Sequence, residues 1–327
     1  PPTVLDCIET INGNSFGIAS SPPTINGLTN KFRLHLKLFR VDGRASTHCR
    51  KMVKFVVVFG AILLQCVLAL PSTRNSLRWS RNLFVNPLIV GGEEAIPNEF
   101  PFMVSMQSRT VGGSYSHRCG GAIINERWIV SASHCTENAV VGATRIVAGE
   151  HSFSTTNGYE QFSDVELFIM HPDYDTVTLE NDIVLIKLLS PLDFSSGKIG
   201  PIALPAMGQE TPAGTNVTVT GWGNLEFNNP DRPDVLNKVS IPTVTDMECR
   251  RSYGPVDMFD SFICAGVPEG GLDSCNGDSG GPLFTSQPQQ LIGIVSWGKD
   301  CALPGYYGVY TEVSYFSDWI TITVANN

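Results

Sequence analysis

The chain has 327 residues and a formal net charge of −9, and this charge is distributed unevenly along it. Residues 1–88 hold 11 Lys/Arg and 3 Asp/Glu, whereas residues 89–327 hold 11 Lys/Arg and 28 Asp/Glu, a formal charge of −17. Such an acidic region argues against nucleic acid or an anionic membrane as a partner and favours a soluble protein. Its 239 residues suffice for a sizeable hydrophobic core.

The N-terminal region contains a predicted targeting segment. A basic start at Met52–Lys54 and an apolar stretch at Phe55–Leu70 are typical of a secretory signal peptide, with cleavage expected near Ala69 or Pro71. A membrane anchor is the alternative, but sixteen residues span only about 24 Å as a helix, less than a hydrocarbon core of about 30 Å. We therefore predict a secreted, extracellular protein with a signal peptide at residues 52–70. Residues 1–51 are then expected to be a non-native leader or a disordered tail.

Beyond residue 88, short apolar runs alternate with turns rich in Gly, Pro and Asn. The clearest runs are Gly121–Val130, Ile183–Leu189, Val217–Gly221 and Leu291–Trp297. This spacing predicts an all-β barrel or sandwich protein. The chain is expected to end in a helix over Tyr315–Val324, although the β-branched residues there have low helix propensity.

Three polar residues in this region have contexts that suggest nucleophilic catalysis. His134 precedes a cysteine, Asp182 precedes an apolar run, and Ser279 lies in the glycine-rich segment Cys275–Pro282. A serine reacts at neutral pH only when a base takes its proton and donors stabilise the developing oxyanion. His134 could act as general base and then general acid, while Asp182 would orient the imidazole and stabilise its charged form.

Three further segments make the chain resemble the chymotrypsin/trypsin family of serine endopeptidases from about residue 89 to the C-terminus: Ile89-Val90-Gly91-Gly92, Gly221-Trp222-Gly223 and Ser296-Trp297-Gly298. The resemblance implies two six-stranded antiparallel β-barrels, joined near residues 201–212, with the active site between them. It also implies the catalytic roles of His134, Asp182 and Ser279 given above. Ser131 and Ser133 replace the threonine and alanine frequent in relatives, and we expect this difference to be tolerated.

The resemblance also implies how substrate is bound. The backbone N–H groups of Gly277 and Ser279 would form the oxyanion hole. Asp273, six positions before Ser279, would lie at the base of the primary specificity pocket, whose other residues would be Ser274, Gly298 and Gly308. A buried, unpaired carboxylate is costly and selects a cationic partner, so we predict cleavage after Arg and Lys.

Residues 71–88 are expected to be an activation peptide. In the family, cleavage before Ile89 frees an α-amino group that pairs with Asp278 and orders the pocket and the oxyanion hole. Leu88 precedes the cleavage site here, where an Arg or Lys would permit self-activation. We therefore expect a chymotrypsin- or elastase-like protease to activate the zymogen.

Six of the nine cysteines lie after residue 88. They carry no paired C-x-x-C spacing of the kind found in metal sites, so disulfides and an oxidising compartment are expected. Six cysteines allow 15 pairings, and the residues alone do not choose among them. The resemblance selects Cys119–Cys135, Cys249–Cys264 and Cys275–Cys301.

The loop at residues 150–160 spaces two carboxylates as calcium-binding trypsins do. Calcium takes about six to eight oxygen ligands. Glu150, Glu160, backbone carbonyls near Ser152 and Thr155, and Asn157 through water could supply several of them. An acidic loop without a metal is the alternative, and catalysis itself is expected to need no cofactor.

Taken together, these features predict the secreted zymogen of a trypsin-like serine endopeptidase with a digestive role. It is expected to act as a monomer on protein substrates and to be blocked by protein protease inhibitors. Two alternatives stay open: a catalytically silent homologue that acts as a binding or regulatory module, and a membrane-anchored protease. The intact His134, Asp182 and Ser279 argue against the first, and the short apolar segment argues against the second. Asn216 begins the only N-x-S/T sequon in the chain and is a candidate glycosylation site.

Overall fold

The structure is a computed structural model, and it describes residues 90–226, 232–254 and 258–327. The predicted leader, signal peptide and activation peptide, and the predicted cleavage site between Leu88 and Ile89, lie outside the described residues. Among the helices of the described part, none combines the length and apolar character needed to span a bilayer.

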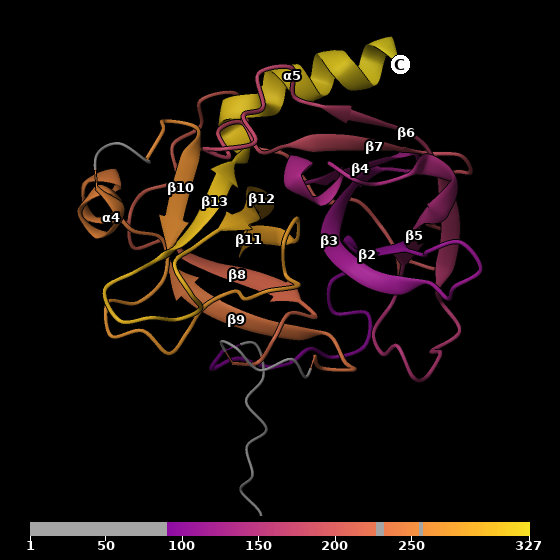
Figure 1. The fold of residues 1–327 in the computed structure, drawn as a ribbon, viewed down its shortest axis with the longest axis horizontal. Coiled ribbons are helices and arrows are strands. Elements are labelled where there is room, and N and C mark those ends of the chain that lie inside the picture. Colours follow the sequence, from indigo (N-terminus) through magenta and orange to yellow (C-terminus); the bar gives the residue numbers. More distant parts are fainter. Residues whose placement is uncertain (1–89, 227–231, 255–257) are drawn as a thin grey trace, which may run out of the picture. The chain divides into compact units, whose positions relative to one another are not determined.

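Six antiparallel strands form a closed barrel in the first half of the described chain (Figure 1). They are β2 (Met103–Ser108), β3 (Ser116–Asn125), β4 (Trp128–Ser131), β5 (Thr144–Ala148), β6 (Gln161–Met170) and β7 (Val184–Leu188). Their order is β2-β3-β4-β7-β6-β5, and the pairing of β5 with β2 closes the barrel. Val104, Ile129 and Leu185 are fully buried inside it, and removing such apolar surface from water favours closure.

The second sheet contains six longer strands and one short strand at its edge. They are β1 (Glu93–Glu94), β8 (Asn216–Gly221), β9 (Asn237–Pro242), β10 (Phe262–Ala265), β11 (Pro282–Ser286), β12 (Gln289–Trp297) and β13 (Gly308–Glu312). Their order is β1-β9-β8-β11-β12-β13-β10. An antiparallel bridge between Thr243 and Ala265 links the end of β9 to β10. The predicted all-β architecture is confirmed as one closed six-stranded barrel and a second antiparallel sheet, to which the short strand β1 is added.

One predicted run differs from the observed elements. Gly121–Val130 is divided between β3 and β4, which form a hairpin. The side chain of Asn125 accepts a hydrogen bond of 2.9 Å from the N–H of Arg127, and this fixes the turn. An Asx turn of this kind explains why an apolar run can reverse direction within three residues.

Two α-helices are present in the described part, α4 (Asp246–Tyr253) and α5 (Val313–Asn326). α5 includes the predicted Tyr315–Val324 helix and extends it at both ends. Phe316 and Ile320 of α5 are buried in a core cluster that joins residues of the first barrel to Phe284, Leu291 and Ile294 of β11 and β12. This tertiary packing outweighs the low helix propensity of the β-branched residues.

The last strand of the first barrel is β7, and apart from β1 the first strand of the second sheet is β8, so the predicted junction near residues 201–212 lies in the connection between these two strands. Part of this connection belongs to the first barrel, because Ile199 and Ile202 are buried in its core. Ala203 forms a parallel bridge with Gln290 of the second sheet. The connection therefore contacts both parts, and the strand ends that carry the candidate site are held close together.

Candidate active site

His134 lies in a single 3₁₀ turn, η1 (Ser133–Cys135), directly after β4. The hydroxyl of Ser131 donates to the carbonyl of Gly120 at 2.8 Å, and that of Ser133 donates to the carbonyl of Ile183 at 2.6 Å. Both serines are fully buried. The two positions that differ from many relatives therefore tie the histidine turn to β3 and to the residue after Asp182.

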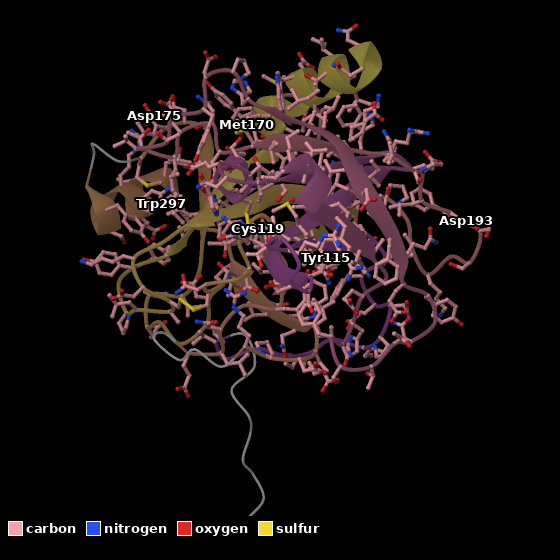
Figure 2. All side chains as sticks on the ribbon, turned by 45° about the vertical axis from the view of Figure 1, so that its right-hand side comes forward. Tyr115, Cys119, Met170, Asp175, Asp193 and Trp297 are labelled. Carbon is pink, nitrogen blue, oxygen red and sulfur yellow. A yellow bond between two sulfur atoms is a disulfide. The ribbon has the colours of Figure 1, made fainter. Side chains whose placement is uncertain are left out.

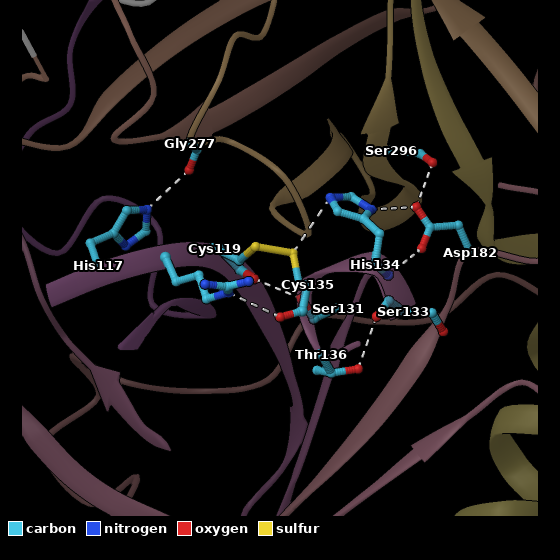
Figure 3. Close-up of a disulfide and its surroundings, with 12 residues drawn as sticks. His117, Cys119, Ser131, Ser133, His134, Cys135, Thr136, Asp182, Gly277 and Ser296 are labelled. Carbon is cyan, nitrogen blue, oxygen red and sulfur yellow. Dashed lines mark hydrogen bonds and ion pairs between the residues drawn. A yellow bond between two sulfur atoms is a disulfide. The ribbon is translucent and has the colours of Figure 1, made fainter. Parts of the chain in front are cut away.

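A buried carboxylate holds the imidazole of His134. Nδ1 of His134 lies 2.7 Å from Oδ2 of Asp182, and Oδ1 of Asp182 accepts the backbone N–H of His134 at 2.9 Å. Ser296 of β12 donates its hydroxyl to Oδ2 at 2.6 Å (Figure 3). Asp182 is fully buried, so these three donors offset the loss of water around its charge. A carboxylate at Nδ1 fixes the tautomer that leaves Nε2 as a proton acceptor.

Ser296 was missed as a functional residue by the sequence analysis, which used its segment only as part of the resemblance. The signal was a small hydroxyl residue at the end of an apolar run, where β12 leaves the sheet. Such a position is common and carries no chemistry by itself. Only the pairing of strands far apart in sequence brings Ser296 to Asp182.

The segment that carries Ser279 is hydrogen-bonded to β3 and to β12. Of these strands, β3 is tied to the turn of His134, and β12 carries the Ser296 that donates to Asp182. The carbonyl of Ser279 accepts the N–H of Gly120 at 2.8 Å, and the N–H of Gly280 donates to the carbonyl of Val295 at 2.8 Å. Gly280 has a φ of +76°, and a side chain there would overlap the hydroxyl of Ser131. Only glycine fits both the positive φ and the close approach of Ser131, which explains why a glycine follows Ser279.

Two members of the predicted triad are hydrogen-bonded to each other, and the third is not bonded to them. Throughout the described residues, no hydrogen bond joins Oγ of Ser279 to the imidazole of His134. Nε2 of His134 instead lies 3.7 Å from Sγ of Cys135 (Figure 3). The contact between Ser279 and His134 stays a prediction.

The backbone around Ser279 offers two N–H groups for an oxyanion. Within the three described ranges, the N–H groups of Gly277 and Ser279 donate to no acceptor of the protein. Gly277 has a φ of +108°, and its carbonyl accepts a hydrogen bond of 3.0 Å from Nε2 of His117 (Figure 3). Burial lowers the pKa of His117 to about 4, so a neutral imidazole supports this peptide at physiological pH.

Asp278 is fully buried beside the oxyanion segment. Its two carboxylate oxygens accept the N–H groups of Gly223 at 2.7 Å and Cys275 at 2.8 Å. Burial raises the pKa of Asp278 to about 6, although these two donors and the charge of Arg232 act in the opposite direction. The predicted partner of this carboxylate, the amino group of Ile89, lies outside the described residues.

Asp273 is buried with an incomplete set of hydrogen-bond partners. Its Oδ2 accepts the N–H of Ala302 at 3.0 Å, but its Oδ1 has no partner within the described part of the chain. Burial raises the pKa of Asp273 to about 7. A Cβ atom on Gly308 would lie 2.7 Å from that free oxygen, so only glycine leaves it open. The arrangement fits a carboxylate that receives a cationic guest.

The other two predicted pocket residues, Ser274 and Gly298, have different surroundings. Oγ of Ser274 lies 3.3 Å from the hydroxyl of Tyr310. Gly298 is exposed, and a Cβ atom on it would have no neighbour closer than 3.7 Å. The disulfide Cys275–Cys301 connects the segment of Asp273 to the loop that supplies its donor, Ala302.

All three disulfides that the resemblance selected are formed: Cys119–Cys135, Cys249–Cys264 and Cys275–Cys301. The first joins β3 to the turn of His134. Its two sulfur atoms and the imidazole form the one compact group of His, Cys, Asp or Glu ligand atoms found within the described ranges. Because both sulfurs are committed to a disulfide, this group is no metal site.

The predicted calcium loop contains two carboxylates that repel each other, those of Glu150 and Glu160. Burial and the neighbouring charge of Glu160 raise the pKa of Glu150 to about 7. Glu160 accepts the N–H groups of Asn157 at 2.6 Å and Gly158 at 2.9 Å. Oγ of Ser152 accepts the N–H of Thr155 at 3.1 Å. A bound dication would relieve the repulsion between these two carboxylates.

The loop also contacts a carboxylate that the sequence analysis did not include. Asp234 accepts hydrogen bonds from Ser152 at 2.6 Å and Ser154 at 2.7 Å. Its charge also contributes to the raised pKa of Glu150. Asp234 lies more than 70 residues further along the chain, so no local spacing could have assigned it to the loop.

Comparisons with known proteins agree with this geometry. The sequence model of the family described as trypsin matches residues 89–320. Trypsin-1 of Astacus astacus is 51% identical over 239 residues, which cover 71% of this chain and 98% of that protein. Serine protease 1 of Rattus norvegicus is 43% identical, over 73% of this chain and 91% of that protein. Trypsin of Sus scrofa is 40% identical, over 73% and 96%.

Proposed function

The chain belongs to the trypsin family and is a serine endopeptidase, and we propose that it cleaves its protein substrates after Arg and Lys through His134, Asp182 and Ser279. The observation that carries the catalytic part is the bond of 2.7 Å between Nδ1 of His134 and the buried carboxylate of Asp182. This bond orients Nε2 as a base and stabilises the imidazolium that forms when Nε2 takes a proton.

Each step of the proposed reaction uses a group described above. Oγ of Ser279 attacks the carbonyl carbon of the scissile bond while Nε2 of His134 takes its proton. The N–H groups of Gly277 and Ser279 donate to the oxyanion of the tetrahedral intermediate. His134 then gives the proton to the leaving amine, and an ester to Ser279 remains. Water, activated by the same imidazole, hydrolyses this acyl-enzyme and restores the free serine.

The preference for Arg and Lys rests on Asp273. Its Oδ1 is buried without a hydrogen-bond donor, and a guanidinium or ammonium group would supply both the donor and the opposite charge. A neutral side chain would leave that carboxylate uncompensated. Because an unpaired buried charge costs roughly 3–5 kcal/mol, cationic residues should be preferred by some hundreds- to thousands-fold.

We also propose that the protein is made as a secreted zymogen with a digestive role. Cleavage between Leu88 and Ile89 would free the amino group that pairs with Asp278. A leucine before the cleavage site suits a chymotrypsin- or elastase-like activator, not the enzyme itself. Calcium would be held by Glu150, Glu160, the carbonyls near Ser152 and Thr155, and Asn157 through water. Its role would be to stabilise this loop, because it takes no part in the reaction.

A defined activation experiment tests the proposed function. The full chain is secreted from eukaryotic cells, treated with chymotrypsin and freed of it, and its new N-terminus is sequenced. We expect Ile89 at that terminus, together with cleavage of a peptide library after Arg and Lys. The same treatment of Ser279→Ala should give the same terminus and no cleavage. Faster cleavage after Phe or Leu than after Arg by the processed protein would contradict the assignment of Asp273.

A further inference from the structure

Arginines gather at one hairpin of this acidic protein. Residues 89–327 hold 11 Lys/Arg against 28 Asp/Glu. Four of these 11 basic residues are arginines around the hairpin between β2 and β3. Arg109 and Arg145 place their guanidinium groups 4.7 Å and 4.2 Å from the ring centre of Tyr115. Arg118 is on β3, and Arg232 donates to the carbonyl of His117, the residue before Arg118, at 3.3 Å.

In the described residues, nearby carboxylates compensate the charges of these four arginines only in part: the charge of Arg145 opposes the rise that burial causes in the pKa of Glu150, and that of Arg232 opposes the same rise in the pKa of Asp278. Among residues 90–226, 232–254 and 258–327, no carboxylate forms an ion pair with any of them, whereas basic residues elsewhere, such as Lys187 and Lys238, do have such partners. Arg118 and Arg232 are also exposed. A positive patch without direct ion pairs in the described part of this strongly negative protein is available to an acidic ligand.

Two of the four arginines lie beside the reacting groups. Nε of Arg118 donates to the carbonyl of Cys135 at 3.4 Å, and Sγ of that cysteine lies 3.7 Å from Nε2 of His134. Nε and Cζ of Arg232 lie 3.4 Å from the point that a Cβ atom on Gly277 would occupy. One guanidinium is therefore next to the histidine turn, and the other is next to the oxyanion segment. Figure 2 labels Tyr115 and Cys119, two residues of this region, near the middle of the view.

The direction in which the substrate leaves connects these arginines to specificity. His134 protonates the leaving amine, so the residues after the scissile bond depart past Nε2. Nε2 faces the disulfide Cys119–Cys135, and Arg118 directly precedes Cys119. The side chain before the scissile bond enters the pocket of Asp273 instead. The leaving segment therefore passes the guanidinium groups of Arg118 and Arg232.

We propose that Arg118 and Arg232 bind acidic side chains in the first three residues after the scissile bond. The preferred substrates are then polypeptides in which an Arg or Lys is followed closely by Asp or Glu. Guanidinium groups match carboxylates in geometry as well as in charge. Exposed ion pairs change affinity by about two- to fivefold each. Arg109 and Arg145 would extend the same preference further along the leaving segment. This inference rests on the proposed function.

Matched peptides test this preference. They share all residues up to a scissile Arg and continue with Glu-Glu, Gln-Gln or Lys-Lys. For the activated full-length protein, we expect kcat/KM for the Glu-Glu peptide to exceed that for Gln-Gln by about fivefold or more, and Lys-Lys to be slowest. Arg118→Gln and Arg232→Gln should each reduce the ratio of Glu-Glu to Gln-Gln about two- to fivefold, and the double variant should bring it to about one.

The ratio within one preparation does not depend on how much of a variant is folded. Arg251→Gln is the matched control, because Arg251 is an exposed arginine of α4, outside the patch, and it should keep the wild-type ratio. At about 1 M NaCl, where the Debye length is about 3 Å, the wild-type ratio should fall toward one. Equal rates for the three peptides, or a ratio unchanged in the double variant, would overturn this inference alone. Failure to cleave any of them after Arg would overturn the proposed function together with it.

Discussion

The carboxylate of Asp273 is buried and lacks a donor at Oδ1, so replacing it with an amide of the same shape removes its charge and little else. We expect Asp273→Asn to bind a small amidine such as benzamidine about a hundred- to a thousandfold more weakly than the wild type, because the buried ion pair is lost. The binding of a small amidine is measured instead of turnover because turnover also depends on proton transfer through His134.

The same substitution should stabilise the free enzyme. The ordinary Asp pKa of 3.8 rises to about 7 in Asp273 because of burial. At about 1.4 kcal/mol per pKa unit, this difference corresponds to at most about 4 kcal/mol against the ionised form. Because the folded pKa lies above the unfolded one, the free energy of unfolding falls as the pH rises from about 4 to about 7 and then levels off. Asp273→Asn should remove this loss and be more stable than the wild type at pH 8.

Calorimetric titration in two buffers of different ionisation enthalpy measures the affinity for benzamidine together with the number of protons released on binding. For the wild type, the inhibition constant of benzamidine should rise about tenfold per pH unit below pH 7, with uptake of the ligand releasing about one proton near pH 6. Asp273→Asn should show no such pH dependence. Equal inhibition constants for wild type and variant from pH 5.5 to 8.5 would refute the assignment of this carboxylate to the pocket.

Three further predictions concern support for the site and the loops around it. Ser296→Ala should lower kcat/KM and cost about 1–3 kcal/mol of stability, because a buried charge loses a donor; unchanged kcat/KM and denaturant midpoint would count against its role. Without calcium, the raised pKa of Glu150 should reduce stability as the pH rises from about 4.5 to about 7, so calcium should raise the melting temperature more at pH 8 than at pH 5. Glu150→Gln should abolish that difference, and equal calcium shifts at both pH values would contradict the loop as a site. Thr245→Ala removes the capping box of α4 and should cost about 1 kcal/mol in urea unfolding without changing kcat/KM.

Much of the fold and of the candidate site could be predicted because the informative residues occur in short local patterns. His134, Asp182 and Ser279 each lie in a segment whose neighbours identify it, and the resemblance then relates the three segments. The all-β class follows from the spacing of apolar runs and turns. The three disulfides followed from the resemblance, since spacing alone leaves 15 pairings open.

The rest depends on contacts between residues distant in sequence. The role of Ser296 arises from a contact with Asp182 across 114 positions, and that of Asp234 from a contact with Ser152 across 82 positions. Neither residue has a distinctive neighbourhood. The arginine patch is likewise assembled by folding, because Arg232 is 115 positions from the carbonyl it contacts.

Covalent labelling of the activated enzyme tests the proposed catalytic machinery most directly. A fluorophosphonate reacts only with a serine whose oxygen is activated by a base and whose adduct is stabilised by an oxyanion hole. Tandem mass spectrometry should find one adduct, on Ser279, and its rate of formation should fall at least a hundredfold in His134→Ala. Cleavage of Arg peptides that persists without an adduct on Ser279, or an adduct that forms equally fast in His134→Ala, would contradict the account.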